Sequence, residues 1–247
     1  MIIVANWKAY VEDLTKGKTL FATSKKLARV SDLRIILAPP SPFLGALALR
    51  NKSSVAFAAQ DVSVTLGGAV TGEITARMSA TAGATYALIG HSERRAKGDT
   101  NEIVAEKLAH AFAHGLIPIL CVGESERDAE GRYLSFIREQ ITAGLAALAP
   151  KERAEVSIAY EPLWAIGKTA EESIGPDDLA EMVLYIRKVL AELLPGKSSR
   201  QTHVLYGGAV ESGNVRDLAA VSMADGFLVG HASTNVSSFT DIVKALS

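Results

Sequence analysis

Residues 156–170 read Val-Ser-Ile-Ala-Tyr-Glu-Pro-Leu-Trp-Ala-Ile-Gly-Lys-Thr-Ala, and the rest of the chain is interpreted around this stretch. The apolar and β-branched run 156–159 predicts a short strand. Pro162 restricts Glu161 to extended backbone, so the strand ends on a single carboxylate. Residues 163–170 then suit a loop that moves. A carboxylate followed by such a loop is typical of a catalytic base beneath a lid, although a surface glutamate in an ordinary connection gives the same pattern.

Short runs like 156–159 recur along the chain, and each is too short for a helix. They are near-continuously apolar, as strands buried on both faces should be. The eight runs cover residues 2–4, 35–37, 55–57, 86–89, 117–122, 156–159, 203–205 and 226–229.

Helical patterns separate these runs. Apolar residues recur at spacings of three and four within 20–28, 137–148 and 179–193, which predicts one buried stripe on each helix. Pro42 and Pro176 stand at expected helix starts, and Gly115 stands just beyond an expected helix end. The segment 73–82 is the weakest helix prediction.

Strands alternating with helices at about 30-residue spacing predict βαβ units and a parallel sheet. The count and the length of 247 residues favour a closed parallel (β/α)8 barrel that forms a single domain over residues 1–247. An open doubly wound sheet is the alternative. It would be favoured by a glycine-rich turn after the first strand, but residues 5–9 read Ala-Asn-Trp-Lys-Ala.

Composition excludes several classes of function. The formal net charge is −1, so no global basic field attracts nucleic acid or an anionic membrane. Cys121 is the only cysteine, which rules out an internal disulfide and a metal site built from several cysteines. No apolar run approaches the ~18–20 residues of a membrane span. The first residues lack the basic segment of a secretory signal peptide, so we expect a cytoplasmic location.

Polar residues follow the predicted strands, at the end of a barrel where enzymes of this fold carry their chemistry. Glu161 can take a proton from carbon. His91 stands at an expected helix start, where the helix dipole favours a neutral imidazole that donates a hydrogen bond. Lys8 supplies a cation for an oxyanion or a phosphate.

Two glycine-containing turns, 207–209 and 230–231, are expected to expose backbone N–H groups to an anion. Taken singly, each of these residues is more often structural than functional. Their gathering at one end of a barrel instead predicts proton transfer next to the carbonyl group of a small phosphorylated substrate.

Several motifs resemble those of the triosephosphate isomerase family, in the family's order and over the whole chain. The resemblance implies a barrel that interconverts dihydroxyacetone phosphate and glyceraldehyde 3-phosphate through an enediolate, without metal or cofactor. The motifs are Ala5-Asn-Trp-Lys8, Gln60, Thr71-Gly-Glu-Ile74, Gly90-His-Ser-Glu-Arg-Arg95, Cys121-Val-Gly-Glu124, Tyr160-Glu-Pro-Leu-Trp164, Leu205-Tyr-Gly-Gly208 and Leu228-Val-Gly230.

The resemblance also implies roles for individual residues. Glu161 matches the base, His91 the neutral electrophile, and Glu93 the partner of the lysine. Contacts to the oxyanion and the phosphate are implied for Asn6, Lys8, Gly167, Ala209, Gly230 and His231, with Cys121, Gly207 and Gly208 in support.

A homodimer is implied as well. In the family, the loop after the third strand inserts into the partner, and Thr71 matches a residue near its tip. The corresponding loop, 62–70, is apolar for a loop, so if it were left exposed it would promote non-specific association. A small phosphorylated triose and a second copy of the chain are therefore the expected partners, with no nucleic acid and no membrane.

The chain departs from the family pattern in four places. The lid tip, 165–170, is two residues shorter than the usual sequence, so we expect isomerisation to survive with altered lid closure. A serine is replaced by Ala209, and a glycine is replaced by His231. Asp61 stands where we expect asparagine, and nothing in the sequence explains that change.

Three other functions stay open at this point. The shorter lid could leave room for a longer phosphorylated ketose such as a tetrulose phosphate. An aldolase-type barrel would use a lysine that forms a Schiff base, for which Lys8 is the candidate. A catalytically silent barrel kept for binding or assembly would be expected to have lost the base.

Overall fold

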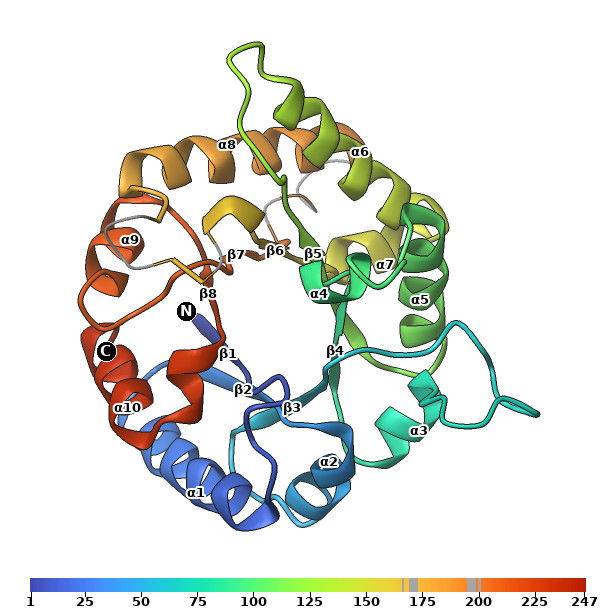
Figure 1. The fold of residues 1–247 in the computed structure, drawn as a ribbon, viewed down its shortest axis with the longest axis vertical. Helices are drawn as coiled ribbons and strands as arrows, with labels where there is room; N and C mark the ends of the chain where they lie inside the picture. Colours follow the sequence, from blue (N-terminus) through green and yellow to red (C-terminus); the bar gives the residue numbers. More distant parts are fainter. Residues whose placement is uncertain (166, 169–172, 195–198, 200) are drawn as a thin grey trace.

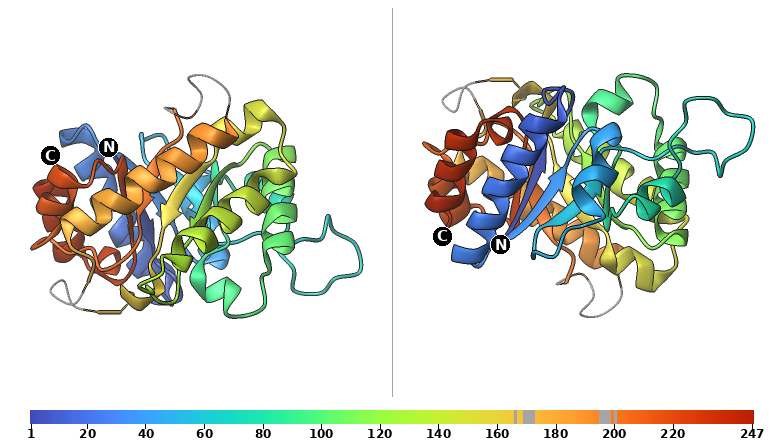
Figure 2. Two further views of the ribbon diagram at one scale, coloured as in Figure 1. Left: turned by 90° about the horizontal axis from the view of Figure 1, so that it is seen from above. Right: turned by 90° about the horizontal axis from the view of Figure 1, so that it is seen from below.

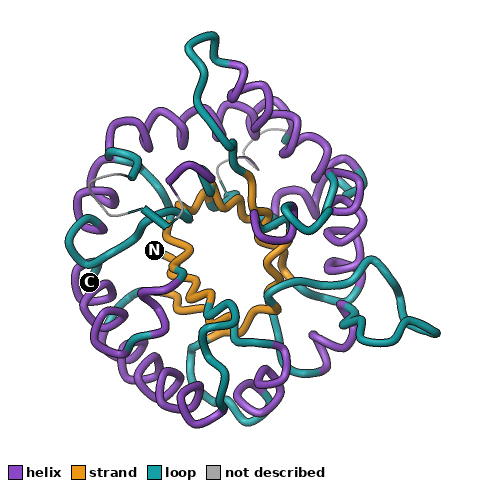
Figure 3. The backbone as a smooth tube through the Cα atoms, in the orientation of Figure 1, coloured by secondary structure: helices purple, strands orange, loops and turns teal. Residues whose placement is uncertain are grey.

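Within the described residues, eight parallel strands close into a barrel in which each strand pairs with the next and β8 pairs with β1 (Figure 1). The structure is a computed structural model that describes residues 1–165, 167–168, 173–194, 199 and 201–247. The strands form an inner ring and the helices an outer one (Figure 3). The predicted closed (β/α)8 barrel is confirmed, and the open doubly wound sheet is excluded.

Every predicted strand run overlaps an observed strand. The ends differ by one or two residues because backbone pairing, rather than apolarity, sets them. Polar Asn6, for example, still belongs to the first strand because it pairs with Ala38 of the second. The strands are β1 (Ile2–Asn6), β2 (Arg34–Ala38), β3 (Ala56–Ala59), β4 (Tyr86–Ile89), β5 (Ile117–Val122), β6 (Ser157–Tyr160), β7 (Val204–Tyr206) and β8 (Gly226–Val229).

The three predicted apolar stripes lie on long helices, and the weak segment 73–82 forms only a short one. A helix start is predicted at His91, where α4 begins, whereas the short helix α7 escaped prediction because one or two turns cannot display a stripe. The helices are α1 (Leu14–Val30), α2 (Ser41–Ala48), α3 (Ala76–Thr81), α4 (Ser92–Arg95), α5 (Asn101–Ala113), α6 (Arg132–Ala146), α7 (Pro150–Glu155), α8 (Pro176–Leu193), α9 (Val215–Val221) and α10 (Val236–Ala245), with 3-10 turns η1 (Leu163–Ala165) and η4 (His231–Thr234). None of those described is long and apolar enough to cross a membrane.

Side chains alternate between two apolar cores. In β1, Ile2 and Val4 pack inside the barrel, whereas Ile3 and Ala5 pack between the sheet and the helices. The alternation follows from the two-residue period of a strand. The inner core contains Ile2, Val4, Ile36, Ala38, Ala58, Tyr86, Leu88, Ile119, Cys121, Ala159, Leu205 and Leu228.

Closure of the ring depends on a glycine. At Gly226, the first residue of β8, an added Cβ would lie 2.0 Å from the carbonyl oxygen of Ile2 in β1. Any other residue would therefore push the last strand away from the first.

A partly buried ion cluster joins the end of β3 to α5 and α4. The Lys107 ammonium is 2.8 and 3.0 Å from the two carboxylate oxygens of Asp61 and 2.6 Å from Oδ2 of Asp99. Arg94 Nε is 2.8 Å from Asp61 Oδ2. Two cations therefore balance two carboxylates, and Lys107 itself is only 2% exposed.

This cluster accounts for the aspartate at position 61. An asparagine there would leave Lys107 and Arg94 facing the single carboxylate of Asp99. Burial raises the pKa of Asp61 above its usual value, and the hydrogen bond and charge of Lys107 oppose that shift only in part. The carboxylate is thus costly to bury and depends on its cations.

Replacing Lys107 with methionine should lower the free energy of unfolding by about 3 kcal/mol, because the change leaves buried carboxylates without their main cation. An acid whose pKa is raised on folding contributes less stability as the pH rises through its folded pKa. We therefore expect the loss to be larger near pH 7 than near about pH 4.5. Urea unfolding of the variant and the parent at both pH values measures it.

The double variant K107M/D61N should recover part of the loss, since it removes one of the two stranded carboxylates. Lys18, which is exposed on α1, provides the matched control, and Lys18→Met should change stability by less than about 0.5 kcal/mol. A Lys107→Met variant as stable as the Lys18 control would contradict the account.

Candidate active site

The strand alternation also builds the site. The inner-core residues of each strand are followed, two positions later, by residues that face the open carboxyl end of the barrel. Because every second residue of a strand faces inward, polar or small residues form one ring above the apolar core. The ring contains Asn6, Gln60, Gly90, Gly123, Glu161, Gly207 and Gly230, and Pro40 takes the corresponding position after β2.

Glu161 and His91 meet at the centre of this end. His91 Nε2 is 3.3 Å from Glu161 Oε1, and the backbone N–H of Ser92 is 3.4 Å from Oε2. Both side chains are buried, with 6% and 5% of their surfaces exposed. The carboxylate therefore lies in a nearly water-free position beside a hydrogen-bond donor.

The predicted position of His91 at a helix start is confirmed. His91 caps α4, and its Nδ1 accepts a hydrogen bond from the backbone N–H of Glu93 at 3.2 Å. A ring nitrogen that accepts carries no proton, so in a neutral ring the proton is on Nε2, which faces Glu161. The imidazole thus presents a donor to the centre of the site.

Two glycines make room for Glu161. An added Cβ at Gly207 would lie 2.8 Å from Glu161 Cγ, and one at Gly123 would lie 1.8 Å from its carbonyl oxygen. The N–H of Gly207 donates to the carbonyl of Tyr160 at 2.8 Å. The turn 207–209 is expected to offer backbone N–H groups to an anion. The N–H of its first residue, Gly207, instead completes the sheet, and this glycine is required because the base needs its space.

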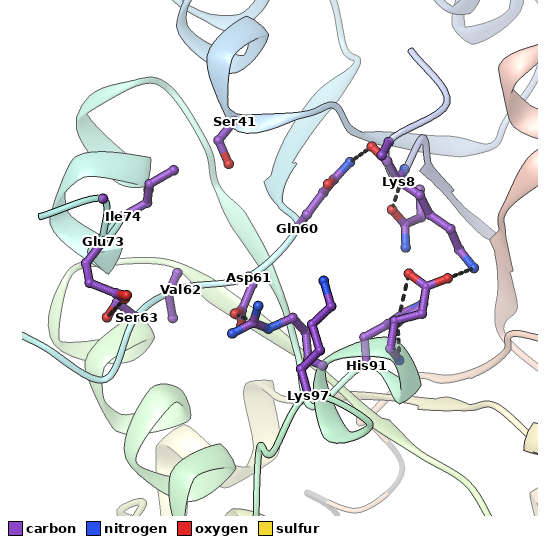
Figure 4. Close-up of a pocket in the computed structure, with 15 residues that line it drawn as sticks. Lys8, Ser41, Gln60, Asp61, Val62, Ser63, Glu73, Ile74, His91 and Lys97 are labelled. Atoms are coloured by element: carbon purple, nitrogen blue, oxygen red, sulfur yellow. Dashed lines mark hydrogen bonds and ion pairs between the residues drawn. The ribbon is translucent and has the colours of Figure 1, made fainter. Parts of the chain in front are cut away.

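Lys8 approaches from the opposite side of the ring, on a strained backbone. Its φ is +46°, in the left-handed region that costs a side-chain-bearing residue about 1 kcal/mol or more. Two bonds hold it there: the Lys8 N–H donates to Asn6 Oδ1 at 3.0 Å, and the Gln60 amide donates to the Lys8 carbonyl at 2.9 Å (Figure 4).

The ammonium of Lys8 is held by Glu93. Nζ is 2.8 Å from Glu93 Oε1, which places the carboxylate where the family resemblance implies it (Figure 4). Partial burial opposes ionisation of Glu93, but the hydrogen bond and charge of Lys8 outweigh it and lower the pKa. The pair therefore remains charged and fixes the direction of the lysine.

Cys121 lies below Glu161, in the inner core. Its burial, and then the negative charge of Glu161, raise the pKa of the thiol well above its ordinary value. The thiol is therefore neutral and packed, which does not suit a nucleophile.

A second group of predicted residues lines a separate cavity of about 440 Å³ beside Lys8. Gly167, Gly208, Ala209, Gly230 and His231 all contribute to its wall. The cavity therefore brings together the residues expected to grip a phosphate. Gly208 also packs under Tyr206, whose hydroxyl would lie 2.0 Å from an added Cβ.

The start of the expected lid is anchored by Glu124. Its Oε1 accepts hydrogen bonds from the Tyr160 hydroxyl at 2.7 Å and from Trp164 Nε1 at 2.9 Å. Arg127 donates in turn to the Tyr160 hydroxyl at 3.2 Å. The predicted tip, 165–170, falls partly outside the described residues, since Ile166, Thr169 and Ala170 are not among them.

The loop after β3 projects from the barrel (Figure 2). Its base is closed by a hydrogen bond from the Ser63 N–H to the Ile74 carbonyl at 2.9 Å and by one between Ser63 and Glu73. Leu66 and Val70 on this arm are 70% and 39% exposed. A cavity of about 390 Å³ lies between the base of the arm and the loops that carry Lys8 and His91 (Figure 4).

Several contacts that shape the site were missed by sequence reasoning. Gln140 of α6 accepts a hydrogen bond from the N–H of Gly123 at 2.9 Å and so fixes the turn against Glu161. Arg95 donates to the carbonyl of Gly90, next to His91, at 2.9 Å. The glycine within Cys-Val-Gly-Glu was a usable signal for close backbone approach, whereas Gln140 lies on a helix and had none.

Comparison with known proteins agrees with this geometry. A family model described as triosephosphate isomerase matches residues 1–246. The triosephosphate isomerase of Carboxydothermus hydrogenoformans is 38% identical, and the match covers 98% of this chain and 97% of the relative. That of Chloroflexus aurantiacus is 39% identical over the same shares. That of Roseiflexus sp. strain RS-1 is 38% identical, over 99% and 97%. The chain belongs to the triosephosphate isomerase family.

Proposed function

We propose that the protein is a triose-phosphate isomerase that interconverts dihydroxyacetone phosphate and glyceraldehyde 3-phosphate, acting in the cytoplasm. One observation carries the proposal: the buried Glu161 carboxylate lies 3.3 Å from a donor nitrogen of His91, at the barrel end that also holds Lys8. A base, a donor and a cation around one space are what proton transfer beside a carbonyl group requires. A silent barrel would have no reason to keep the base buried.

In the proposed reaction, Glu161 removes a proton from the carbon next to the carbonyl. The electron pair of that C–H bond forms the carbon–carbon double bond of the enediolate, and the carbonyl oxygen takes up the negative charge. His91 Nε2 and Lys8 Nζ stabilise this charge in a position from which water is largely excluded. Glu161 then returns the proton to the neighbouring carbon, and His91 moves a proton between the two oxygens.

The phosphate of the substrate occupies the cavity lined by Gly167, Ala209, Gly230 and His231 in this proposal. The cavity adjoins the ring that holds Glu161, because Lys8 lines both it and the space next to His91. Lys8 can therefore contact the oxyanion side and the phosphate side of one small molecule. A substrate in which a phosphate and a carbonyl are separated by only a few atoms would contact Lys8 at both ends.

Shortening the base by one methylene, in the variant Glu161→Asp, should lower kcat by about a hundredfold and change KM little, because the carboxylate retreats by roughly 1 Å from the reacting carbon. A coupled assay of glyceraldehyde 3-phosphate conversion measures both constants. Glu12, an exposed glutamate before α1, provides the matched control, since Glu12→Asp should leave kcat and KM unchanged. Equal kcat values for Glu161→Asp and the parent would overturn the assignment of the base.

We further propose that the protein is a homodimer in which the loop after β3, residues 62–70 with Thr71 near its tip, enters the partner chain. The loop is a braced arm with exposed apolar side chains, and each chain carries a cavity beside Lys8 and Glu93 that can receive such an arm. Because this cavity adjoins Lys8, the partner's arm would help to hold the lysine in its strained conformation.

Introducing a charged residue into the arm should dissociate the dimer into monomers. In Val70→Glu, a carboxylate would have to be buried without a partner, so sedimentation should report a single chain of 26.1 kDa where the parent sediments at twice that mass. The same change at Val30, which is 80% exposed at the end of α1, should leave the dimer intact. A dimeric Val70→Glu variant, or a monomeric parent, would rule out this arrangement.

A further inference from the structure

Besides its glycine turns, the cavity assigned to the phosphate is lined by two aromatic side chains, Tyr10 and His231. The rings of Tyr10 and His231 meet edge to face at its wall, with their centroids 4.8 Å apart and their planes at 70°. His231 stands where the resemblance to the family calls for a second glycine. A glycine would offer only a backbone N–H to the cavity, whereas this chain adds an imidazole.

The backbone on both sides of this ring pair is fixed. The Thr234 hydroxyl donates to the carbonyl of His231 at 2.8 Å, and the ammonium of Lys16 donates to the carbonyl of Tyr10 at 3.1 Å. The main chain that carries the two rings is therefore fixed, and the imidazole of the exposed His231 packs against the Tyr10 ring at the wall of the cavity.

The polar atoms of the ring pair can bind a ligand. Among the residues that the structure describes, no hydrogen bond engages an imidazole nitrogen of His231 or the hydroxyl of Tyr10. An imidazole that lines a polar cavity and has no protein partner can donate to a ligand oxygen.

The charges around the cavity favour an anion. Lys8 and Lys168 line it with positive charge, and Glu211 is the carboxylate that lines it. Lys8 and His231 both line the cavity, and at Gly230, next to His231, an added Cβ would lie 3.6 Å from Lys8 Cε and 4.0 Å from Nζ. Ala209 on the opposite turn has no hydroxyl, so that turn offers a phosphate one donor fewer than a serine would.

We propose that the side chain of His231, braced by Tyr10, is a substrate-binding group that donates a hydrogen bond from its imidazole to a phosphate oxygen in this cavity. This inference rests on the proposed function, because it takes the cavity to hold the phosphate of the substrate. His231 touches the phosphate and not the reacting carbons, so it acts on binding rather than on the proton transfer.

The test measures the affinity for inorganic phosphate by calorimetry and its inhibition constant against glyceraldehyde 3-phosphate. Three variants separate donation from packing. His231→Gly removes the ring, His231→Phe keeps the ring against Tyr10 without a donor, and His231→Gln keeps a donor without the ring. Loss of a hydrogen bond to a charged group should weaken phosphate binding about tenfold in the Gly and Phe variants. The KM for the substrate should rise by a similar factor with kcat nearly unchanged, and Gln should stay closest to the parent.

Phosphate binding within about twofold of the parent in both the Gly and Phe variants would overturn the proposal, since that change is far smaller than the loss of such a bond. Weak binding in Gly with full binding in Phe would overturn it too, because ring packing alone would then account for the effect. The calorimetry needs no turnover. A parent that binds phosphate in a His231-dependent way, yet does not convert the triose phosphate, would refute the proposed isomerase activity and leave this inference standing.

Discussion

The structure depends on one constraint, which is that the side chains of eight closed parallel strands must alternate between the inside and the outside of the ring. Every second residue enters the barrel, so the interior fills with apolar side chains until the strands end. The next inward position of each strand then faces an open mouth. Glu161 holds such a position just after β6, Asn6 at the end of β1 and Gln60 just after β3, so residues far apart in the sequence gather at one end of the barrel.

Closure of the ring also packs the residues at the carboxyl end of the barrel closely around Glu161. This close packing excludes water from the carboxylate. Glu161 fits only because Gly207 and Gly123 have no side chains, which keeps its carboxylate nearly free of water. In such a position a single well-placed donor has a large effect on a developing charge. His91 supplies that donor because the start of α4 fixes its Nδ1 as an acceptor. On the other side, Lys8 adopts a left-handed backbone that Asn6 and Gln60 stabilise. The polar residues that surround the reacting groups thus also preserve their geometry.

Much of this arrangement could be predicted from sequence, and the remainder could not, for physical reasons. Strands buried on both faces appear as apolar runs, so the barrel could be predicted. Once the strands were placed, Glu161, His91 and Lys8 could be predicted to gather at one end of it. The reason for Gly207 within its turn could not be predicted, since a sequence does not reveal whether a glycine is needed for its free N–H or for its missing side chain. The partners of Asp61 come from α4 and α5, and only the packed structure brings Lys107 against it. The contact between Tyr10 and His231 joins the loops after β1 and β8, which are distant in sequence and become neighbours when the ring closes.

The central claim is that a carboxylate moves a proton between two carbons through an enediolate. Conversion of glyceraldehyde 3-phosphate by the purified protein in D2O, followed by proton NMR of the dihydroxyacetone phosphate formed, tests it most directly. A proton held on Glu161 can exchange with solvent before it is returned, so the account predicts deuterium on the carbon that receives it in part of the product. Product formed without any solvent deuterium would contradict the account, because that is the result expected of hydride transfer between the carbons.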